Sequence, residues 1–164
     1  MPTITDATLY QLTEQLATGL LSRQWQLVTA ESCTGGWLAK CCTDLSGSSA
    51  WFAGGVVSYS NELKQSLLGV SHETLRQFGA VSEPVVNEMA AGAIEKLGGQ
   101  ISVAISGIAG PGGGSDEKPV GLVCFGFASA KQSFCCQQLF AGDRETIRRQ
   151  AVAFALRKLI EMLE

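Results

Sequence analysis

The sequence has little charge and almost no histidine. Of its 164 residues only 16% are charged and 46% are hydrophobic, so a chain of this length can bury a sizeable core. Its formal net charge is −3, and a chain without a basic surplus lacks the charge that neutralises a nucleic-acid backbone. We therefore expect a single domain over residues 1–164 and no nucleic-acid partner.

The single histidine, His72, restricts the nucleophilic chemistry that the chain can support. A Ser-His-Asp triad or a Cys-His pair needs a histidine beside the nucleophile. His72 follows Ser71, a residue type that begins helices, and we expect it at a solvated surface position. Cys33 is accordingly interpreted as a small buried residue and not as a nucleophile.

Signals for export, membrane insertion and metal binding are also missing. The amino-terminal segment carries Asp6 and Glu14 and has no basic start followed by an apolar run, unlike a signal peptide or a membrane span. The cysteines, at positions 33, 41, 42, 124, 135 and 136, lack CxxC spacing, and the carboxylates at 116, 117 and 143 have no histidine partner. We expect a cytoplasmic protein with reduced, mostly buried thiols and no bound metal.

Common nucleotide-binding fingerprints are absent as well. The segment 107–114, GIAGPGGG, does not open a helix as GxGxxG does, and no GxxxxGK[ST] occurs. The sequence therefore supports neither a dinucleotide site nor an ATP site. Pattern alone leaves open whether the glycine-rich segment 107–119 is a binding loop or a plain connection.

Hydrophobic periodicity and turn residues predict alternating helices and strands. Expected strands cover 26–30, 51–60, 101–106, 120–129 and 133–141. Expected helices follow the capping residues Thr5-Asp6, Asn61, Ser71, Ser82 and Asp143, and a further helix covers 35–44. The last two strands are separated by only a few residues, which predicts an antiparallel hairpin. The fold class that we expect is α/β, a three-layer α/β/α sandwich with a mixed, mainly parallel sheet.

A serine paired with a lysine remains as a source of nucleophilic chemistry. The stretch 47–64, GSSAWFAGGVVSYSNELK, sets two serines, a tyrosine and a lysine around an apolar strand. A serine hydroxyl can attack an amide if a neutral lysine takes its proton, which requires burial or nearby positive charge. Arg144, Arg148 or Arg149 could supply that charge. Spacing alone also fits turn serines, a capping Asn61 and a solvated Lys64.

Five stretches resemble one known family. They are AESCTGGWLAK (30–40), GSSAWFAGGVVSYSNELK (47–64), GAVSEPVVNEMA (79–90), ISGIAGPGGGSDEKPVG (105–121) and FAGDRETIRRQA (140–151). Together, in this order and spacing, they resemble the CinA carboxy-terminal domain family in its stand-alone form. The resemblance implies hydrolysis of the carboxamide of nicotinamide mononucleotide (NMN) to nicotinate mononucleotide and ammonia, without a cofactor or metal.

The resemblance also implies roles for individual residues. The nucleophile falls on a serine of the GSSA motif, Ser49 in preference to Ser48, and the base falls on Lys64, with Tyr59 beside the pair. The residues expected to bind substrate are Ser32, Thr34, Gly35, Gly36, Ser48, Ser106, Gly107, Arg144 and Arg148. At the start of a helix, the backbone N–H groups of 34–36 are suited to a phosphate or an oxyanion, although they also fit an ordinary turn.

Two alternatives remain open at this point. The domain could bind a nucleotide without catalysis, or the same residues could hydrolyse a different amide. The resemblance further implies a homo-oligomer, a dimer or higher.

Overall fold

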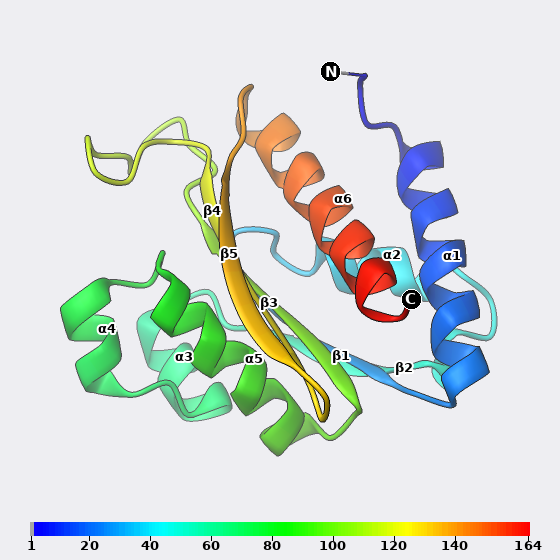
Figure 1. The fold of residues 1–164 in the computed structure, drawn as a ribbon. Coiled ribbons are helices and arrows are strands. Elements are labelled where there is room, and N and C mark those ends of the chain that lie inside the picture. The colour runs from blue at the N-terminus through cyan, green and yellow to red at the C-terminus, as the bar shows by residue number, and fades with distance from the viewer. Residues whose placement is uncertain (1) are drawn as a thin grey trace.

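A five-stranded mixed sheet forms the centre of the computed structural model, which describes residues 2–164 (Figure 1). The strands are β1 (Leu27–Glu31), β2 (Phe52–Val57), β3 (Ile101–Gly107), β4 (Leu122–Ser129) and β5 (Ser133–Leu139). Their order is β2-β1-β3-β4-β5. β1 pairs in parallel with β2 and β3, whereas β4 pairs antiparallel with β3 and β5. The expected mixed sheet and hairpin are confirmed, and all strands except β4 point the same way.

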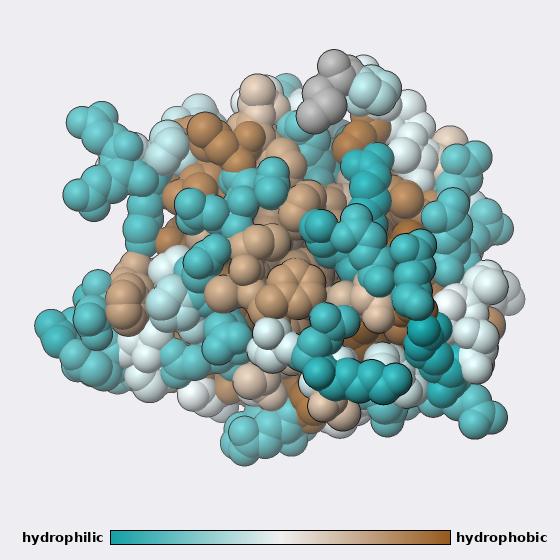
Figure 2. Space-filling model, in the orientation of Figure 1, coloured by the Kyte–Doolittle hydropathy of each residue, from teal (hydrophilic) through white to brown (hydrophobic). Residues whose placement is uncertain are grey.

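Helices cover both faces of the sheet, which confirms the three-layer architecture (Figure 1). One face carries α1 (Asp6–Arg23), α2 (Trp37–Thr43) and α6 (Arg144–Met162), and the other carries α3 (Asn61–Leu68), α4 (His72–Phe78) and α5 (Glu83–Leu97). A separate hydrophobic core lies between the sheet and each of the two helical layers, because the two sets of buried side chains lie on opposite faces of the strands. On the face shown in Figure 2, hydrophilic side chains surround a central region in which hydrophobic side chains reach the surface.

Most helices begin where the capping residues predict. The side chains of Thr5, Ser71, Ser82 and Asp143 each accept a hydrogen bond from the backbone N–H three residues later. The cap of α3 differs from the prediction. Ser60, and not Asn61, precedes the helix and accepts from the N–H of Leu63 at 3.1 Å.

A close helix contact places α3, which carries the lysine of the sequence motif. Gly92 in α5 faces the carbonyl of Leu68 at the end of α3, and a Cβ at position 92 would lie only 1.8 Å from that oxygen. The missing side chain therefore lets the two backbones approach each other. This contact fixes α3 against the sheet layer.

Several smaller expectations can be compared with the structure. His72 is exposed, as expected. All six cysteines are free, and four of them are buried. Within residues 2–164, no helix combines the length and the apolar character needed to cross a membrane.

Candidate active site

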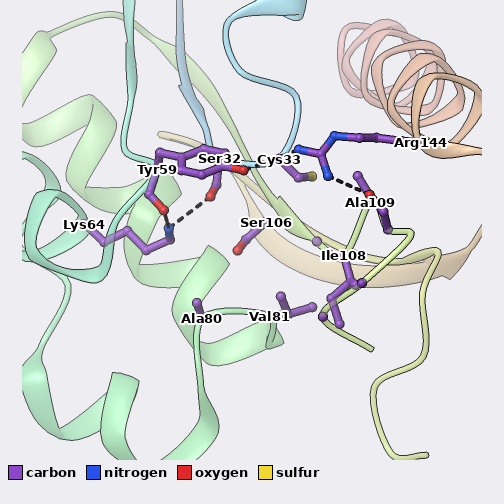
Figure 3. Close-up of a pocket in the computed structure, with 14 residues that line it drawn as sticks. Ser32, Cys33, Tyr59, Lys64, Ala80, Val81, Ser106, Ile108, Ala109 and Arg144 are labelled. Atoms are coloured by element: carbon purple, nitrogen blue, oxygen red, sulfur yellow. Dashed lines mark hydrogen bonds between the residues drawn. The ribbon is translucent and has the colours of Figure 1, made fainter. Parts of the chain in front are cut away.

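A pocket of about 280 Å³ opens where β1, β2 and β3 end (Figure 3). Ser32 directly follows β1, Tyr59 lies two residues beyond β2, and Ser106 is the penultimate residue of β3. The carboxyl ends of parallel strands are where open α/β sheets commonly bind ligands. The residues that line the pocket are Ser32, Cys33, Tyr59, Lys64, Ala80, Val81, Ser106, Gly107, Ile108, Ala109, Gly110, Gly112, Gly113 and Arg144.

Lys64 is the buried cation of this pocket. It lies in the first turns of α3, and only 1% of the residue is exposed. Its Nζ lies 2.7 Å from the carbonyl oxygen of Ser58, 3.3 Å from that of Tyr59 and 3.1 Å from Ser32 Oγ. Among residues 2–164, no carboxylate forms an ion pair with it. Burial lowers the pKa of Lys64, because the charged form loses hydration that no carboxylate replaces.

The three partners of Lys64 determine where its lone pair points. A neutral amine has two N–H bonds and one lone pair, and a carbonyl oxygen can only accept. The two N–H groups are therefore directed to the carbonyls of Ser58 and Tyr59, which leaves the lone pair for the hydroxyl of Ser32. In this state Ser32 Oγ–H donates to Nζ, the arrangement that a general base needs.

The expected pairing of Lys64 with Ser49 is corrected by this geometry. Ser49 is exposed in a short 3₁₀ turn (Ser48–Ala50) that precedes β2, and its carbonyl accepts a hydrogen bond from Gln26, just before β1. The six residues of β2 separate this turn from the Lys64 end of the sheet, a span of about 17 Å at the usual rise per residue. Ser48 and Ser49 therefore lie at the amino ends of the parallel strands, outside the pocket.

The Thr34–Gly36 segment lies beside the pocket and lines a different hollow, together with Arg148. Gly35 and Gly36 adopt left-handed backbone conformations, with φ of 60° and 96°, which turn the chain from β1 into α2. The N–H groups of Leu38 and Ala39 in the first turn of α2 donate to the buried carboxylate of Glu31 at 2.9 and 3.0 Å. The first turn of α2 is therefore occupied by a carboxylate of the protein itself. Of the N–H groups of 34–36 that were expected to bind an anion, that of Gly35 donates to the carbonyl of Ser32 at 3.0 Å.

The two arginines expected in the pocket have different positions. Arg144 lines it, donating to the carbonyl of Gly110 at 2.7 Å and to the hydroxyl of Tyr59 at 3.4 Å (Figure 3). Arg148 donates from Nε to the carbonyl of Cys33 at 3.0 Å and from Nη2 to that of Thr34 at 3.2 Å. Arg144 therefore faces the pocket, whereas Arg148 faces the backbone of the turn after β1.

Cys33 lines the pocket beside Ser32 without the properties of a reactive thiol. Burial raises its pKa to about 12, so the thiol stays protonated at neutral pH. This agrees with its interpretation as a small buried residue.

Comparison with known proteins identifies the family. Residues 9–163 match the CinA C-terminal domain. The chain belongs to this family. It is 55% identical over 157 residues to nicotinamide-nucleotide amidohydrolase PncC of Escherichia coli (strain K12), with 95% of each chain covered. A CinA-like protein of Mycolicibacterium gilvum is 50% identical over 147 residues, which make up 89% of this chain and 34% of that longer protein.

Solved structures of the CinA family share the fold. The competence/damage inducible protein CihA of Agrobacterium tumefaciens has a TM-score of 0.94 and 38% identity, covering 100% of this chain and 99% of that one. The competence damage-inducible protein A of Klebsiella pneumoniae has a TM-score of 0.91 and 42% identity, covering 94% and 96%. The fold, including its mixed sheet, is therefore that of known CinA proteins.

Sequence reasoning did not assign several pocket residues of this CinA domain. Ala80 and Val81 form an apolar wall (Figure 3), and Ile108 and the glycines of 110–113 form the wall opposite α3. Both groups lie inside stretches that carry the family resemblance, GAVSEPVVNEMA and ISGIAGPGGGSDEKPVG. Small and apolar side chains give no chemical signal of their own, so only the resemblance pointed to these segments.

Proposed function

We propose that this protein is a nicotinamide-nucleotide amidohydrolase that converts NMN to nicotinate mononucleotide and ammonia, with Ser32 as nucleophile and Lys64 as general base. The observation that carries the proposal is the buried Lys64 Nζ, without a carboxylate partner within residues 2–164 and 3.1 Å from Ser32 Oγ in a pocket. The 55% identical relatives from Escherichia coli and Shigella flexneri are named nicotinamide-nucleotide amidohydrolases, which supports the reaction and the substrate class.

The contacts of Lys64 support each proton transfer in the first half of the reaction. Ser32 Oγ attacks the carboxamide carbon while its proton passes to Nζ. The resulting ammonium keeps two N–H bonds on the carbonyls of Ser58 and Tyr59 and has one proton left. That proton goes to the amide nitrogen as the C–N bond breaks, and ammonia leaves.

The second half of the reaction uses the same groups in reverse. Water attacks the ester carbon and gives a proton to Lys64 Nζ. The bond between the carbon and Ser32 Oγ then breaks, and Oγ regains the proton. Nicotinate mononucleotide leaves, and Lys64 is neutral again for the next cycle.

The other end of the pocket suits the phosphate of a nucleotide. Arg144 is the exposed cation among the pocket residues, since Lys64 is buried. A guanidinium and the backbone N–H groups of a glycine-rich loop are suitable donors for a phosphate. We assign the phosphate to Arg144 and the 110–113 segment, and the pyridine ring to the apolar wall of Ala80 and Val81.

The test is turnover of NMN by purified wild-type protein, with ammonia and nicotinate mononucleotide both measured. We expect Ser32→Ala and Lys64→Met to lose activity by at least about 100-fold, because each removes one partner of the proton transfer. Ser49→Ala is the matched control, the same chemical change at an exposed serine outside the pocket, and should keep full activity. Loss of activity in Ser49→Ala with retention in Ser32→Ala would overturn the assignment of the nucleophile.

Turnover and binding together separate the remaining alternatives. NMN binding measured by calorimetry without release of ammonia would support a non-catalytic nucleotide-binding domain instead. Absence of both binding and release would direct the search to a different amide.

A further inference from the structure

The turn that follows Ser32 is held from two sides by side chains that do not line the pocket. Glu31 precedes Ser32 and only 1% of it is exposed. Its carboxylate accepts from the N–H groups of Leu38 and Ala39, which joins the end of β1 to the start of α2. A buried carboxylate with two backbone donors is stable only in this arrangement, so the position of the turn relative to α2 is fixed.

Arg148 holds the other side of the same turn. Its guanidinium donates to two consecutive carbonyls, those of Cys33 and Thr34, and lies over the ring of Trp37 with 5.5 Å between Cζ and the ring centroid. Two donors of one rigid planar group therefore fix two adjacent peptide units. Arg148 reaches this position from α6, so a long helix on one face of the sheet controls the backbone beside Ser32.

The backbone N–H of the residue directly after the proposed nucleophile is free in this arrangement. The carbonyl of Ser32 accepts from the N–H of Gly35 at 3.0 Å. Because C=O and N–H point in opposite directions in a trans peptide unit, the N–H of Cys33 points away from that contact. Within residues 2–164 it has no acceptor. Cys33 itself lines the pocket.

We propose that the N–H of Cys33 binds the oxyanion that forms on the carboxamide oxygen, and that Arg148 and Glu31 are positioning residues that hold this N–H in place. The inference rests on the proposed function. It gives Arg148 a role different from substrate binding, which the sequence had suggested. Removing one oxyanion donor typically slows an enzyme by about 100- to 1000-fold, so misplacing this N–H should lower kcat while substrate binding is kept.

The test compares Arg148 with Arg144, a matched arginine about one turn away in α6. We expect Arg148→Ala and Arg148→Lys to lower kcat by about 100-fold with KM within about threefold of wild type. Lysine keeps the charge but lacks the rigid planar fork that places two separate nitrogen donors on adjacent carbonyls. Arg144→Ala should instead raise KM. A rise in KM with unchanged kcat for Arg148→Ala would overturn the inference, because Arg148 would then bind substrate.

Chemical rescue separates positioning from a general loss of stability. Arg148 borders a hollow of about 400 Å³ at the surface, so added guanidinium can enter the site that Arg148→Ala vacates. We expect guanidinium to restore part of kcat in Arg148→Ala and none in Arg148→Lys. The thermal unfolding midpoint of each variant is measured alongside, to detect a loss of stability. No rescue of a variant with a wild-type thermal midpoint would contradict the positioning role.

A covalent probe makes the result independent of NMN turnover. A phosphonofluoridate labels an activated serine: the Oγ–P bond forms, the P–F bond breaks, fluoride leaves and the proton passes to Lys64. Its P=O oxygen occupies the position of the oxyanion. If wild type is labelled on Ser32 but does not hydrolyse NMN, the proposed substrate is wrong, while slower labelling of Arg148→Ala still supports the inference. Equal labelling rates for wild type and Arg148→Ala would overturn it.

Discussion

Replacement of Lys64 by alanine offers the sharpest test of the proposed base. The change removes Cγ, Cδ, Cε and Nζ from a side chain that is 1% exposed, so a cavity is left between Ser32 and the carbonyls of Ser58 and Tyr59. Loss of a positioned base typically costs about 100- to 10,000-fold in rate. A small primary amine such as methylamine can occupy the vacated space, accept the proton of Ser32 and donate to the same carbonyls. We therefore expect added alkylamines to restore part of the activity of Lys64→Ala.

The pH dependence of kcat/KM gives the second half of this test. Only the neutral amine can take the proton of Ser32, so the wild-type rate should rise with pH, about tenfold per unit, until Lys64 is deprotonated. Because burial lowers the pKa of Lys64, the plateau should begin below the ordinary lysine value of about 10.4. In rescued Lys64→Ala the rise should follow the pKa of the added amine.

The assay is initial-rate ammonia release across pH, with Ser49→Ala as the control that should reproduce the wild-type profile. If Lys64→Ala without added amine kept the wild-type rise with pH, another group would be the base. The reasoning would then be refuted, since it derives the pH dependence from Lys64 alone.

Three further predictions concern stability. The pKa of Lys64 is lower in the folded than in the unfolded chain, so between these two pKa values the unfolded chain binds more protons. The free energy of unfolding should therefore rise with pH over this interval. Urea titrations should show this rise in wild type and not in Lys64→Met. Gly92→Ala should lower the free energy of unfolding by about 1–3 kcal/mol or more and reduce activity, because the added Cβ would lie 1.8 Å from the carbonyl oxygen of Leu68. The control is Gly19→Ala in α1, where the added Cβ meets only a side chain. This variant should keep the stability and activity of wild type. Thr29→Val should raise the free energy of unfolding by about 1–3 kcal/mol, because the buried Thr29 hydroxyl has no hydrogen-bond partner within residues 2–164. An unchanged urea midpoint would contradict this prediction.

The fold could be predicted largely because its signals are local. A capping side chain such as Ser71 or Asp143 contacts the backbone only three residues away, so a short stretch of sequence is enough to predict the start of the helix. The error at α3 has the same origin. Ser60 and Asn61 are both good capping residues, and sequence alone does not fix which of two neighbours begins the helix.

The site could be predicted only in part because its contacts are long-range. The sequence pointed to a serine and a lysine as the reacting residues, which stays a prediction. Of the expected site residues, Tyr59, Lys64, Ser106, Gly107 and Arg144 do line one pocket. The contact between Ser32 and Lys64 joins residues 32 apart in sequence, and it exists because β1 and β2 are neighbours in the sheet. The family resemblance pointed to a serine close to Lys64 in sequence, which is a different property from closeness in space.

The position of the proposed nucleophile follows from the direction of the strands. In a parallel pair, residues that follow each strand meet at one edge of the sheet, and residues that precede each strand meet at the opposite edge. Ser32 follows β1, and Lys64 follows β2 by one short turn into α3, so both lie at the carboxyl edge. Ser49 precedes β2 and lies at the amino edge, beside Gln26, which precedes β1. Any mechanism that uses Lys64 as base must therefore take its nucleophile from the carboxyl edge, where Ser32 is the serine whose hydroxyl is within hydrogen-bonding distance of Nζ among residues 2–164.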